Sequence, residues 1–307
     1  MIVSLGESLI DRIHPLGGGE AEARIGGSPY NVAIALARLG VPAGYLCPLS
    51  TDAYGDRLHD GLVQHGVRVC VSDRVDAPTA IAEVRTDDRG HPAYTFHREG
   101  TADRCLNLRP PVDALPVGTK AVHFGSLTLA QADDWPHWRA AIQSAKAAGA
   151  FVALDPNLRP PLIDDMSAYC ERLDEAVAMA DWVKASDEDL AVLHPGIDPV
   201  DAIQRWRGGG RTVVLTEGAR GAQLWTAAGH HAVRPVAQVG TVVDTVGAGD
   251  TFQAAVLAWL WHADALRTPV TPAMVDDLLA FATRAAALNC ARPGCQPPTR
   301  EAVIQLG

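Results

Sequence analysis

The chain has 307 residues, of which 48% are hydrophobic and 20% are charged, and its formal net charge is −10. This composition is typical of a globular protein with a sizeable core, and the acidic balance argues against a nucleic-acid surface. No apolar run approaches the roughly 18–20 residues of a membrane span, and the start lacks the basic region of a signal peptide. We therefore expect a cytoplasmic protein that binds neither nucleic acid nor a membrane. The six cysteines include no CxxC pair, which favours free thiols.

Strands and helices alternate along most of the chain. In its first third, strands are expected at 1–5 and 43–50 and helices at 31–39 and 54–66. Residues 67–105 instead predict short strands separated by turns, with no helix among them. The remainder returns to alternation. Strands are expected at 121–126, 151–155, 181–186, 211–218, 221–227 and 230–235. Helices are expected at 135–148 and 169–179, in a segment that runs through Trp206, and in two closing segments.

This order predicts an α/β fold with a mostly parallel central sheet covered by helices on both faces. A ligand would bind at the carboxyl ends of the strands. We expect a main domain formed by 1–10, 31–66 and 106–307. Residues 11–30 and 67–105 would form a small β-sheet lid over that cleft.

The most informative segment is residues 241–262, TVVDTVGAGDTFQAAVLAWLWH. A β-branched run leads into the turn Gly247-Ala248-Gly249, which Asp250 and an apolar helix follow. The first N–H groups of a helix have no intrahelical partner and favour an anion. A phosphate site with a carboxylate beside it is suited to phosphoryl transfer to a hydroxyl. The alternative is a glycine turn with an aspartate cap, which is common. A helix N-terminus is also expected to lower the pKa of Asp250.

A second segment, GGSPYN at 26–31, opens a helix that Gly40 ends. Together with DTVGAGD at 244–250, it resembles the two signatures of the ribokinase/PfkB family of carbohydrate kinases. MIVSLGESLID at the start, DPNLRPP at 155–161 and ALNCARPGCQPP at 287–298 are most similar to fructokinase-type members. The resemblance covers essentially the whole chain and implies a three-layer αβα ribokinase-like domain with a β-sheet lid.

The resemblance assigns the sugar to residues near the start of the chain and in the lid. Asp11 would accept hydrogen bonds from vicinal hydroxyls, and Gly27 and Asn31 would supply close backbone approach and an amide. Arg98 would reach the substrate when the lid closes. Without the resemblance, Asp11 is an ordinary loop aspartate. For Arg98, a solvent-facing arginine is the alternative.

The run Asp155-Pro156-Asn157-Leu158-Arg159 ends a strand. Residues 155, 157 and 159 share one side if the chain stays extended, and an arginine there would pair with phosphate. The resemblance places Asn157 and Arg159 near the triphosphate, with Arg159 assigned to the substrate. A strand-end turn with a surface salt bridge is the alternative.

The resemblance places the nucleotide and its metal farther along the chain. Lys184, Ser186 and Asp189 match a K-x-N-x-x-E stretch, although serine replaces asparagine and aspartate replaces glutamate here. Asp189 would join Mg²⁺ through water, although acids at a helix start also stabilise the helix dipole. Asp244 would lie near a monovalent cation, for which K⁺ is plausible.

Thr216, Gly218 and Gly221 resemble a T-x-G-x-x-G nucleotide cradle and equally suit a hairpin turn. Thr283 stands where many relatives carry asparagine, and no base contact is assigned to it.

Other nucleotide and metal motifs are absent from the sequence. There is no GxxxxGK[ST], no GxGxxG with an acidic partner about twenty residues on, and no HExxH. These absences disfavour a Walker-type nucleotide site, a dinucleotide oxidoreductase and a zinc hydrolase.

The resemblance implies transfer of the γ-phosphoryl group of ATP to a primary hydroxyl of a small-molecule sugar, with Mg²⁺ as cofactor and Asp250 as base. D-Fructose, giving fructose 6-phosphate, is the expected substrate. The alternatives are 2-keto-3-deoxygluconate kinase and nucleoside or aminoimidazole riboside kinase. A non-catalytic sugar- or nucleotide-binding regulator is the alternative from another class. A homodimer through the lid is expected by resemblance only.

Overall fold

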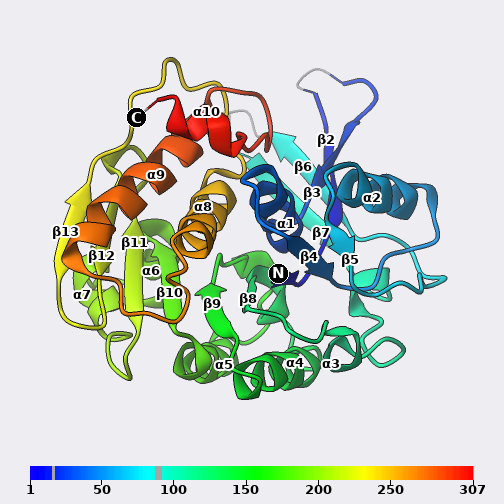
Figure 1. Cartoon of the computed structure of the whole chain (residues 1–307). Helices are drawn as coiled ribbons and strands as arrows, with labels where there is room; N and C mark the ends of the chain where they lie inside the picture. Colours follow the sequence, from blue (N-terminus) through cyan, green and yellow to red (C-terminus); the bar gives the residue numbers. More distant parts are fainter. Residues whose placement is uncertain (16–17, 87–91, 307) are drawn as a thin grey trace.

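The computed structural model describes residues 1–15, 18–86 and 92–306. Its centre is a nine-stranded sheet in the order β13-β12-β11-β10-β9-β8-β1-β4-β5 (Figure 1). The neighbouring strands β11, β10, β9, β8, β1, β4 and β5 run parallel to one another. At the other edge, β12 pairs antiparallel with β11, and β13 pairs antiparallel with β12. The bounds are β1 Ile2–Leu5, β4 Ala43–Leu46, β5 Arg68–Val69, β8 Ala121–Gly125, β9 Phe151–Asp155, β10 Trp182–Ser186, β11 Thr212–Thr216, β12 Ala222–Trp225 and β13 His231–Arg234.

The central strands are apolar on both faces. Val213, Val214 and Leu215 of β11 are all fully buried, so successive side chains are covered on opposite sides of the sheet. A continuous apolar run of this kind suits a parallel strand between two helix layers.

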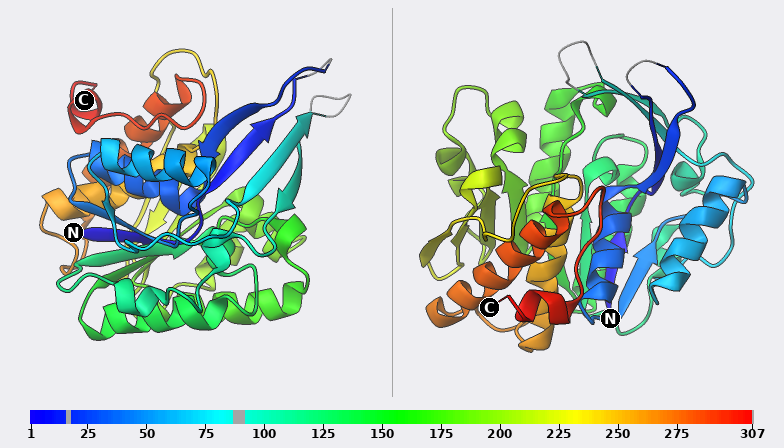
Figure 2. Two further views of the ribbon diagram at one scale, coloured as in Figure 1. Left: turned by 90° about the vertical axis from the view of Figure 1, so that its right-hand side faces the viewer. Right: turned by 90° about the horizontal axis from the view of Figure 1, so that it is seen from above.

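Helices cover both faces, so the predicted three-layer α/β fold is confirmed (Figure 2). On one face lie α1 Ser28–Arg38, α2 Ala53–Gln64, α8 Ala248–His262 and α9 Pro272–Cys290, and on the other lie α4 Trp135–Ala147 and α5 Met166–Met179. Shorter helices are α3 Pro111–Ala114, α6 Asp187–Leu193, α7 Pro199–Gln204 and α10 Arg300–Ile304. No helix in the described ranges is both long and apolar enough to cross a membrane.

Helix α8 is central because it packs against both α1 and α9. Most of its residues are buried, as expected for a helix that is apolar around its whole circumference. Small residues such as Ala254, Ala255 and Ala258 are fully covered and permit close approach of the neighbours. This packing fixes the N-terminal end of α8 at the carboxyl edge of the sheet.

A separate four-stranded sheet in the order β3-β2-β6-β7 projects from the main body (Figure 2). Its strands are β2 Leu9–Ile13, β3 Glu22–Gly26, β6 Ile81–Thr86 and β7 Pro92–His97. Two segments expected in the lid lie elsewhere. Residues 68–69 pair with β4 at the edge of the large sheet, and residues 28–30 begin α1, where Pro29 suits the first helical turn.

Gly125 ends β8 and fixes the turn that follows. Its φ is 151°, and a Cβ there would lie 1.7 Å from the carbonyl oxygen of Asp155. Gly118 is a matched control, because its φ is also positive, at 79°, but nothing lies within 4 Å of a Cβ. Gly125→Ala is expected to lower the free energy of unfolding by at least ~3 kcal/mol, against ~1 kcal/mol for Gly118→Ala. Urea unfolding of both variants tests this, and equal losses would contradict the packing argument.

Candidate active site

A cleft of about 1220 Å³ lies at the carboxyl ends of the parallel strands, between the large sheet and the lid sheet. Most residues that the sequence assigned to a site line it. They are Asp11, Gly27, Asn31, Asn157, Arg159, Lys184, Ser186, Asp189, Thr216, Gly218, Gly221, Asp244, Gly247, Ala248, Gly249 and Asp250. Arg98 is not among the lining residues.

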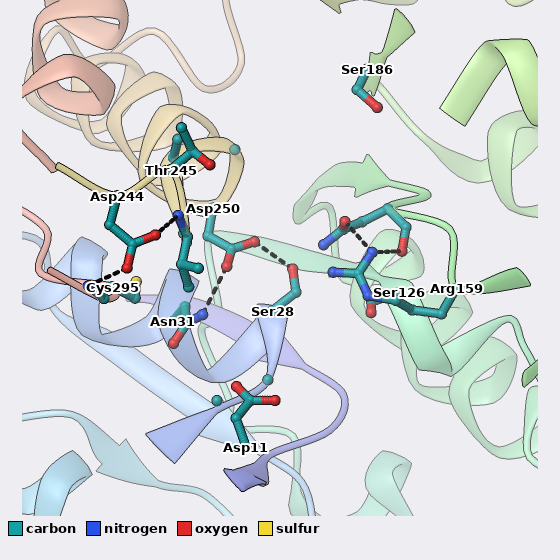
Figure 3. A pocket seen from close by; sticks show the side chains of 18 of the residues that line it. Asp11, Ser28, Asn31, Ser126, Arg159, Ser186, Asp244, Thr245, Asp250 and Cys295 are labelled. Carbon is teal, nitrogen blue, oxygen red and sulfur yellow. Dashed lines mark hydrogen bonds between the residues drawn. The ribbon is translucent and has the colours of Figure 1, made fainter. Parts of the chain in front are cut away.

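Asp250 stands in the first turn of α8 and reaches across to α1 (Figure 3). The Ser28 hydroxyl donates a 2.6 Å hydrogen bond to its Oδ1, and the Asn31 amide donates a 2.9 Å bond to its Oδ2. The side chain is 7% exposed and lines the cleft. Each carboxylate oxygen is therefore held by a separate donor, which fixes the orientation of the group.

The expected direction of the Asp250 pKa is wrong. Burial raises the pKa of Asp250 above its ordinary value, and the opposing effects of Ser28, Asn31 and Lys184 do not cancel that rise. Desolvation of the charged form outweighs the helix N-terminus here. A raised pKa makes the carboxylate a stronger base.

The glycine turn before Asp250 has two distinct roles. Gly247 caps α8 in a left-handed conformation with φ 73°, and a Cβ there would lie 2.2 Å from Cys295 Sγ. The Ala248 N–H donates a 3.1 Å bond to the Thr245 carbonyl, so in this structure the amide is engaged within the turn. Gly249 and Asp250 lie in the first turn, where N–H groups have no intrahelical acceptor. The candidate anion donors of this turn are therefore the N–H groups of Gly249 and Asp250.

Lys184 of β10 supplies a buried positive charge beside this turn. Its Nζ lies 2.7 Å from Asp155 Oδ2, and a Cβ on Gly249 would lie 3.2 Å from it. Burial lowers the pKa of Lys184, but Asp155 and Asp189 more than offset this and raise it, so the ammonium stays charged. A larger residue at 249 would crowd this cation.

The segment after β9 does not stay extended, which corrects the expected alignment of 155, 157 and 159. Asn157 has φ 40°, so the chain turns there, and Asp155 is left facing Lys184 in the interior. Asn157 and Arg159 do line the cleft, with Arg159 Nη1 donating 2.8 Å to Asn157 Oδ1 (Figure 3). The left-handed asparagine conformation carries no sequence signal strong enough to predict it.

Asp189 and Asp244 both engage backbone amides. Asp189 Oδ1 accepts from Leu158 N at 2.8 Å, and its Oδ2 accepts from Ser186 in a capping box. Asp244 accepts from Val246 N at 3.0 Å and Gly294 N at 2.8 Å. Both acids thus join loops at the cleft, and a direct metal bond would compete with these contacts. No cluster of three metal-ligating side chains occurs in the described part of the chain.

The turn between β11 and β12 forms another wall of the cleft. Gly218 and Gly221 have φ of 53° and 106°, and a Cβ on Gly221 would lie 2.1 Å from the Arg234 carbonyl oxygen. Thr216 Oγ1 donates to Ala185 O at 3.4 Å. The turn joins two antiparallel strands, so it is a hairpin turn, and it also lines the cleft. The two interpretations of this segment are thus compatible.

Asp11 projects from lid strand β2 into the cleft. Burial raises the pKa of Asp11 to about 6, with Arg159 and Arg24 opposing the rise. A Cβ on Gly26 would lie 2.3 Å from Asp11 Oδ2, and one on Gly27 would lie 2.7 Å from the Glu7 carbonyl oxygen. Gly26 therefore leaves room for the carboxylate, and Gly27 lets the backbone at Glu7 and Ser8 approach closely.

Arg98 has a different position from the one expected. It is 6% exposed and its Nε lies 2.7 Å from Asp103 Oδ2. The structure thus places it in a buried ion pair, neither in solvent nor among the residues that line the cleft.

The sequence did not single out several polar lining residues, among them Ser28, Glu7 and Ser126. Ser28 donates a hydrogen bond to Asp250. It belongs to the GGSPYN segment, and its hydroxyl directly after two glycines could have marked it as a site residue. Glu7 and Ser126 line the cleft from the ends of β1 and β8, and Glu7 Oε2 accepts from Leu127 N at 3.3 Å. Only the folded topology brings these two strand ends together.

A model of the pfkB family of carbohydrate kinases matches residues 1–302. The chain belongs to that family. A fructokinase of Rhizobium leguminosarum bv. trifolii is 36% identical over 281 residues, covering 90% of this chain and 84% of that protein. A probable fructokinase-4 of Arabidopsis thaliana is 32% identical over 320 residues, covering 100% and 96%.

Solved structures of pfkB-type sugar kinases agree with this assignment. A fructokinase of Xylella fastidiosa with bound ATP has a TM-score of 0.88 and 29% identity, covering 99% of this chain and 97% of that one. A fructokinase double mutant of Vibrio cholerae O395, bound to fructose, ADP and potassium, has a TM-score of 0.84 and 25% identity, covering 99% and 97%. The predicted carbohydrate-kinase family and fold are confirmed, and the roles of individual residues stay predictions.

Glu7 gives the site a pH-dependent effect on stability. Burial raises the pKa of Glu7 to about 7, opposed first by Arg98. The native protein therefore keeps a proton that the unfolded chain has lost, and this group's contribution to stability falls as pH rises from about 4.5 to about 7. Glu7→Gln should thus gain stability relative to the parent at pH 8 compared with pH 5. Urea unfolding of both proteins at both pH values tests this. Other acids titrate in the parent and in the variant alike, so the difference between the two proteins isolates Glu7. A difference independent of pH would refute it.

Proposed function

We propose that the chain phosphorylates D-fructose at its primary hydroxyl with ATP, giving D-fructose 6-phosphate and ADP. The observation that carries this proposal is the Asp250 carboxylate, which lines the cleft in a fixed orientation beside a helix N-terminus. The fructokinases among its relatives support fructose as the sugar.

In the proposed mechanism the sugar lies between Asp11 of the lid and Asp250 of the main body. Its primary hydroxyl attacks the γ-phosphorus of ATP in line, its proton passes to Asp250, and the bond to the leaving ADP oxygen breaks. Ser28 and Asn31 orient the carboxylate, and the raised pKa of Asp250 favours proton uptake. Orientation and ionisation matter most because the transition state is loose.

The developing phosphoryl charge is stabilised by groups already in place. The first-turn amides of α8 and the ammonium of Lys184 lie on one side, and Arg159 lies across the cleft. Such preorganised donors cost no reorganisation during the reaction. Covering of the cleft by the lid would exclude water, and with it ATP hydrolysis.

Mg²⁺ is the metal we propose, because it binds through nucleotide phosphates with few protein ligands. When bound it supplies charge neutralisation on the triphosphate. Asp189 fits a contact through water, since both its oxygens already accept protein hydrogen bonds. We further propose that K⁺ binds near Asp244, which the potassium dependence of turnover tests. A cytoplasmic location and a homodimer through the lid are two more predictions.

The central prediction concerns Asp250→Asn, which keeps the shape of the side chain and removes the base. Loss of a general base typically costs ~10²–10⁴ in rate, so kcat should fall at least ~100-fold while sugar and ATP affinity are largely kept. Steady-state kinetics with coupled ADP detection measures this. Asp113→Asn, an exposed acid on α3, is the control and should leave kcat unchanged. Near-normal turnover of the Asp250 variant would remove this residue from the chemistry.

The sugar is tested with a panel of D-fructose, D-ribose, a nucleoside, aminoimidazole riboside and 2-keto-3-deoxygluconate. We expect the highest kcat/KM for D-fructose. A higher value for another compound would overturn the choice of sugar but not the kinase chemistry. Absence of ADP release with every compound would favour a non-catalytic sugar- or nucleotide-binding regulator.

A further inference from the structure

Lys184 lies where the surroundings disfavour a positive charge. Its side chain is 4% exposed, and its Nζ would lie only 3.2 Å from a Cβ on Gly249. Gly249 belongs to the first turn of α8, where the N–H groups carry a partial positive charge. Burial and the helix end both act against an ammonium here, so the charge of Lys184 depends on a nearby anion.

Asp155 is the acid that contacts this ammonium. Its Oδ2 lies 2.7 Å from Lys184 Nζ, and its side chain is 2% exposed. Val183 pairs with Leu154 on the neighbouring parallel strand, so the next residues, Lys184 and Asp155, lie side by side at the carboxyl edge of the sheet. Lys184 lines the cleft, whereas Asp155 is not among the lining residues. Asp155 therefore acts on a ligand in the cleft through Lys184 and not by contact.

Three other titratable groups face Lys184 but form no salt bridge with it in the described part of the chain, namely Asp189 of α6, Asp250 of α8 and His123 of β8. Burial lowers the pKa of Lys184, and Asp155 is the largest influence that raises it, ahead of Asp189 and Asp250. Both of those carboxylates already accept hydrogen bonds from other groups. Burial, followed by Lys184, lowers the pKa of His123 to about 3, so this ring is neutral and balances no charge. Asp155 is thus the principal counter-ion.

We infer that Asp155 is a positioning residue, which keeps Lys184 charged and fixed beside the first turn of α8 before the nucleotide binds. The inference rests on the proposed function and deepens it, because the ammonium then meets the terminal phosphate without first taking up a proton. A cation already in place costs no reorganisation when its ligand arrives.

The charge of Lys184 can be observed directly by NMR. The chain has three lysines, Lys120, Lys146 and Lys184, so labelled lysine side chains give few signals, and Lys184→Met identifies the one from Lys184. Without nucleotide at pH 8, we expect an ammonium at Lys184 in the parent. In Asp155→Asn we expect a neutral amine there, because the contacting acid no longer offsets burial. Addition of AMP-PCP with Mg²⁺ should restore the ammonium, since the phosphates then supply the negative charge.

Calorimetry of AMP-PCP with Mg²⁺ supplies the functional readout. At pH 8, Asp155→Asn should bind this analogue at least ~10-fold more weakly than the parent, because each unit of pKa below the working pH costs tenfold. The loss should shrink at pH 6, where the solvent protonates Lys184 in the variant. Burial also raises the pKa of Asp155 to about 6, so the parent has begun to lose the counter-ion at that pH. A merely structural defect would give the same loss at both pH values.

Asp181→Asn is the matched control. Asp181 Oδ1 lies 3.6 Å from Lys146 Nζ in a half-exposed pair of the same two residue types, and neither residue lines the cleft. The control should leave both the Lys146 signal and the affinity for AMP-PCP as in the parent.

A charged Lys184 in nucleotide-free Asp155→Asn, or an unchanged affinity for AMP-PCP at pH 8, would overturn the inference. If Asp155→Asn does not fold, the parent supplies the test. Its Lys184 should be an ammonium at pH 8 without nucleotide, and the signal should move as the pH falls through about 6, where Asp155 takes up a proton. A neutral amine at pH 8, or no such change, would also overturn the inference. Failure of the parent to release ADP with any sugar would count against the proposed function, while the lysine signals still decide the role of Asp155.

Discussion

The attachment of one carboxylate to a second helix underlies the whole site. Asp250 belongs to α8, and the donors that orient it, Ser28 and Asn31, belong to α1, more than two hundred residues earlier in the chain. The two helices pack side by side, so the orientation of the acid depends on helix packing (Figure 1). A base held in this way needs no reorganisation when a hydroxyl arrives.

Burial sets the electrostatics of the cleft more than local helix geometry does. Glu7, Asp11 and Asp250 all have a raised pKa, and desolvation is the largest cause in each case. The opposing cations Lys184 and Arg159 contribute less to these pKa values. Carboxyl groups with a pKa raised by burial cluster at functional sites, which agrees with the position of these three in one cleft.

The sequence predicts the architecture well because periodicity and glycine turns report on local structure. Alternating strands and helices indicated the three-layer fold, and the segments GGSPYN and DTVGAGD located both helix starts at the cleft. These signals depend on neighbours in the chain, and a family resemblance linked them.

The features that could not be predicted depend on tertiary contacts. Three examples are the turn at Asn157, the buried ion pair of Arg98 and the hydrogen bond of the Ala248 amide. In each, the contacts that a residue makes are set by the folded structure. The predicted direction of the Asp250 pKa was wrong for the same reason, because desolvation depends on how the folded protein packs around the carboxyl group. A two-residue strand such as 68–69 is also too short to assign from periodicity.

The most direct test of the account is a crystal structure with D-fructose and a non-hydrolysable ATP analogue. We expect a carboxylate oxygen of Asp250 about 2.6–3.2 Å from the primary hydroxyl, with the γ-phosphate between that hydroxyl and the first turn of α8. A complex in which the hydroxyl binds elsewhere, while Asp250 contacts only Ser28 and Asn31, would contradict it.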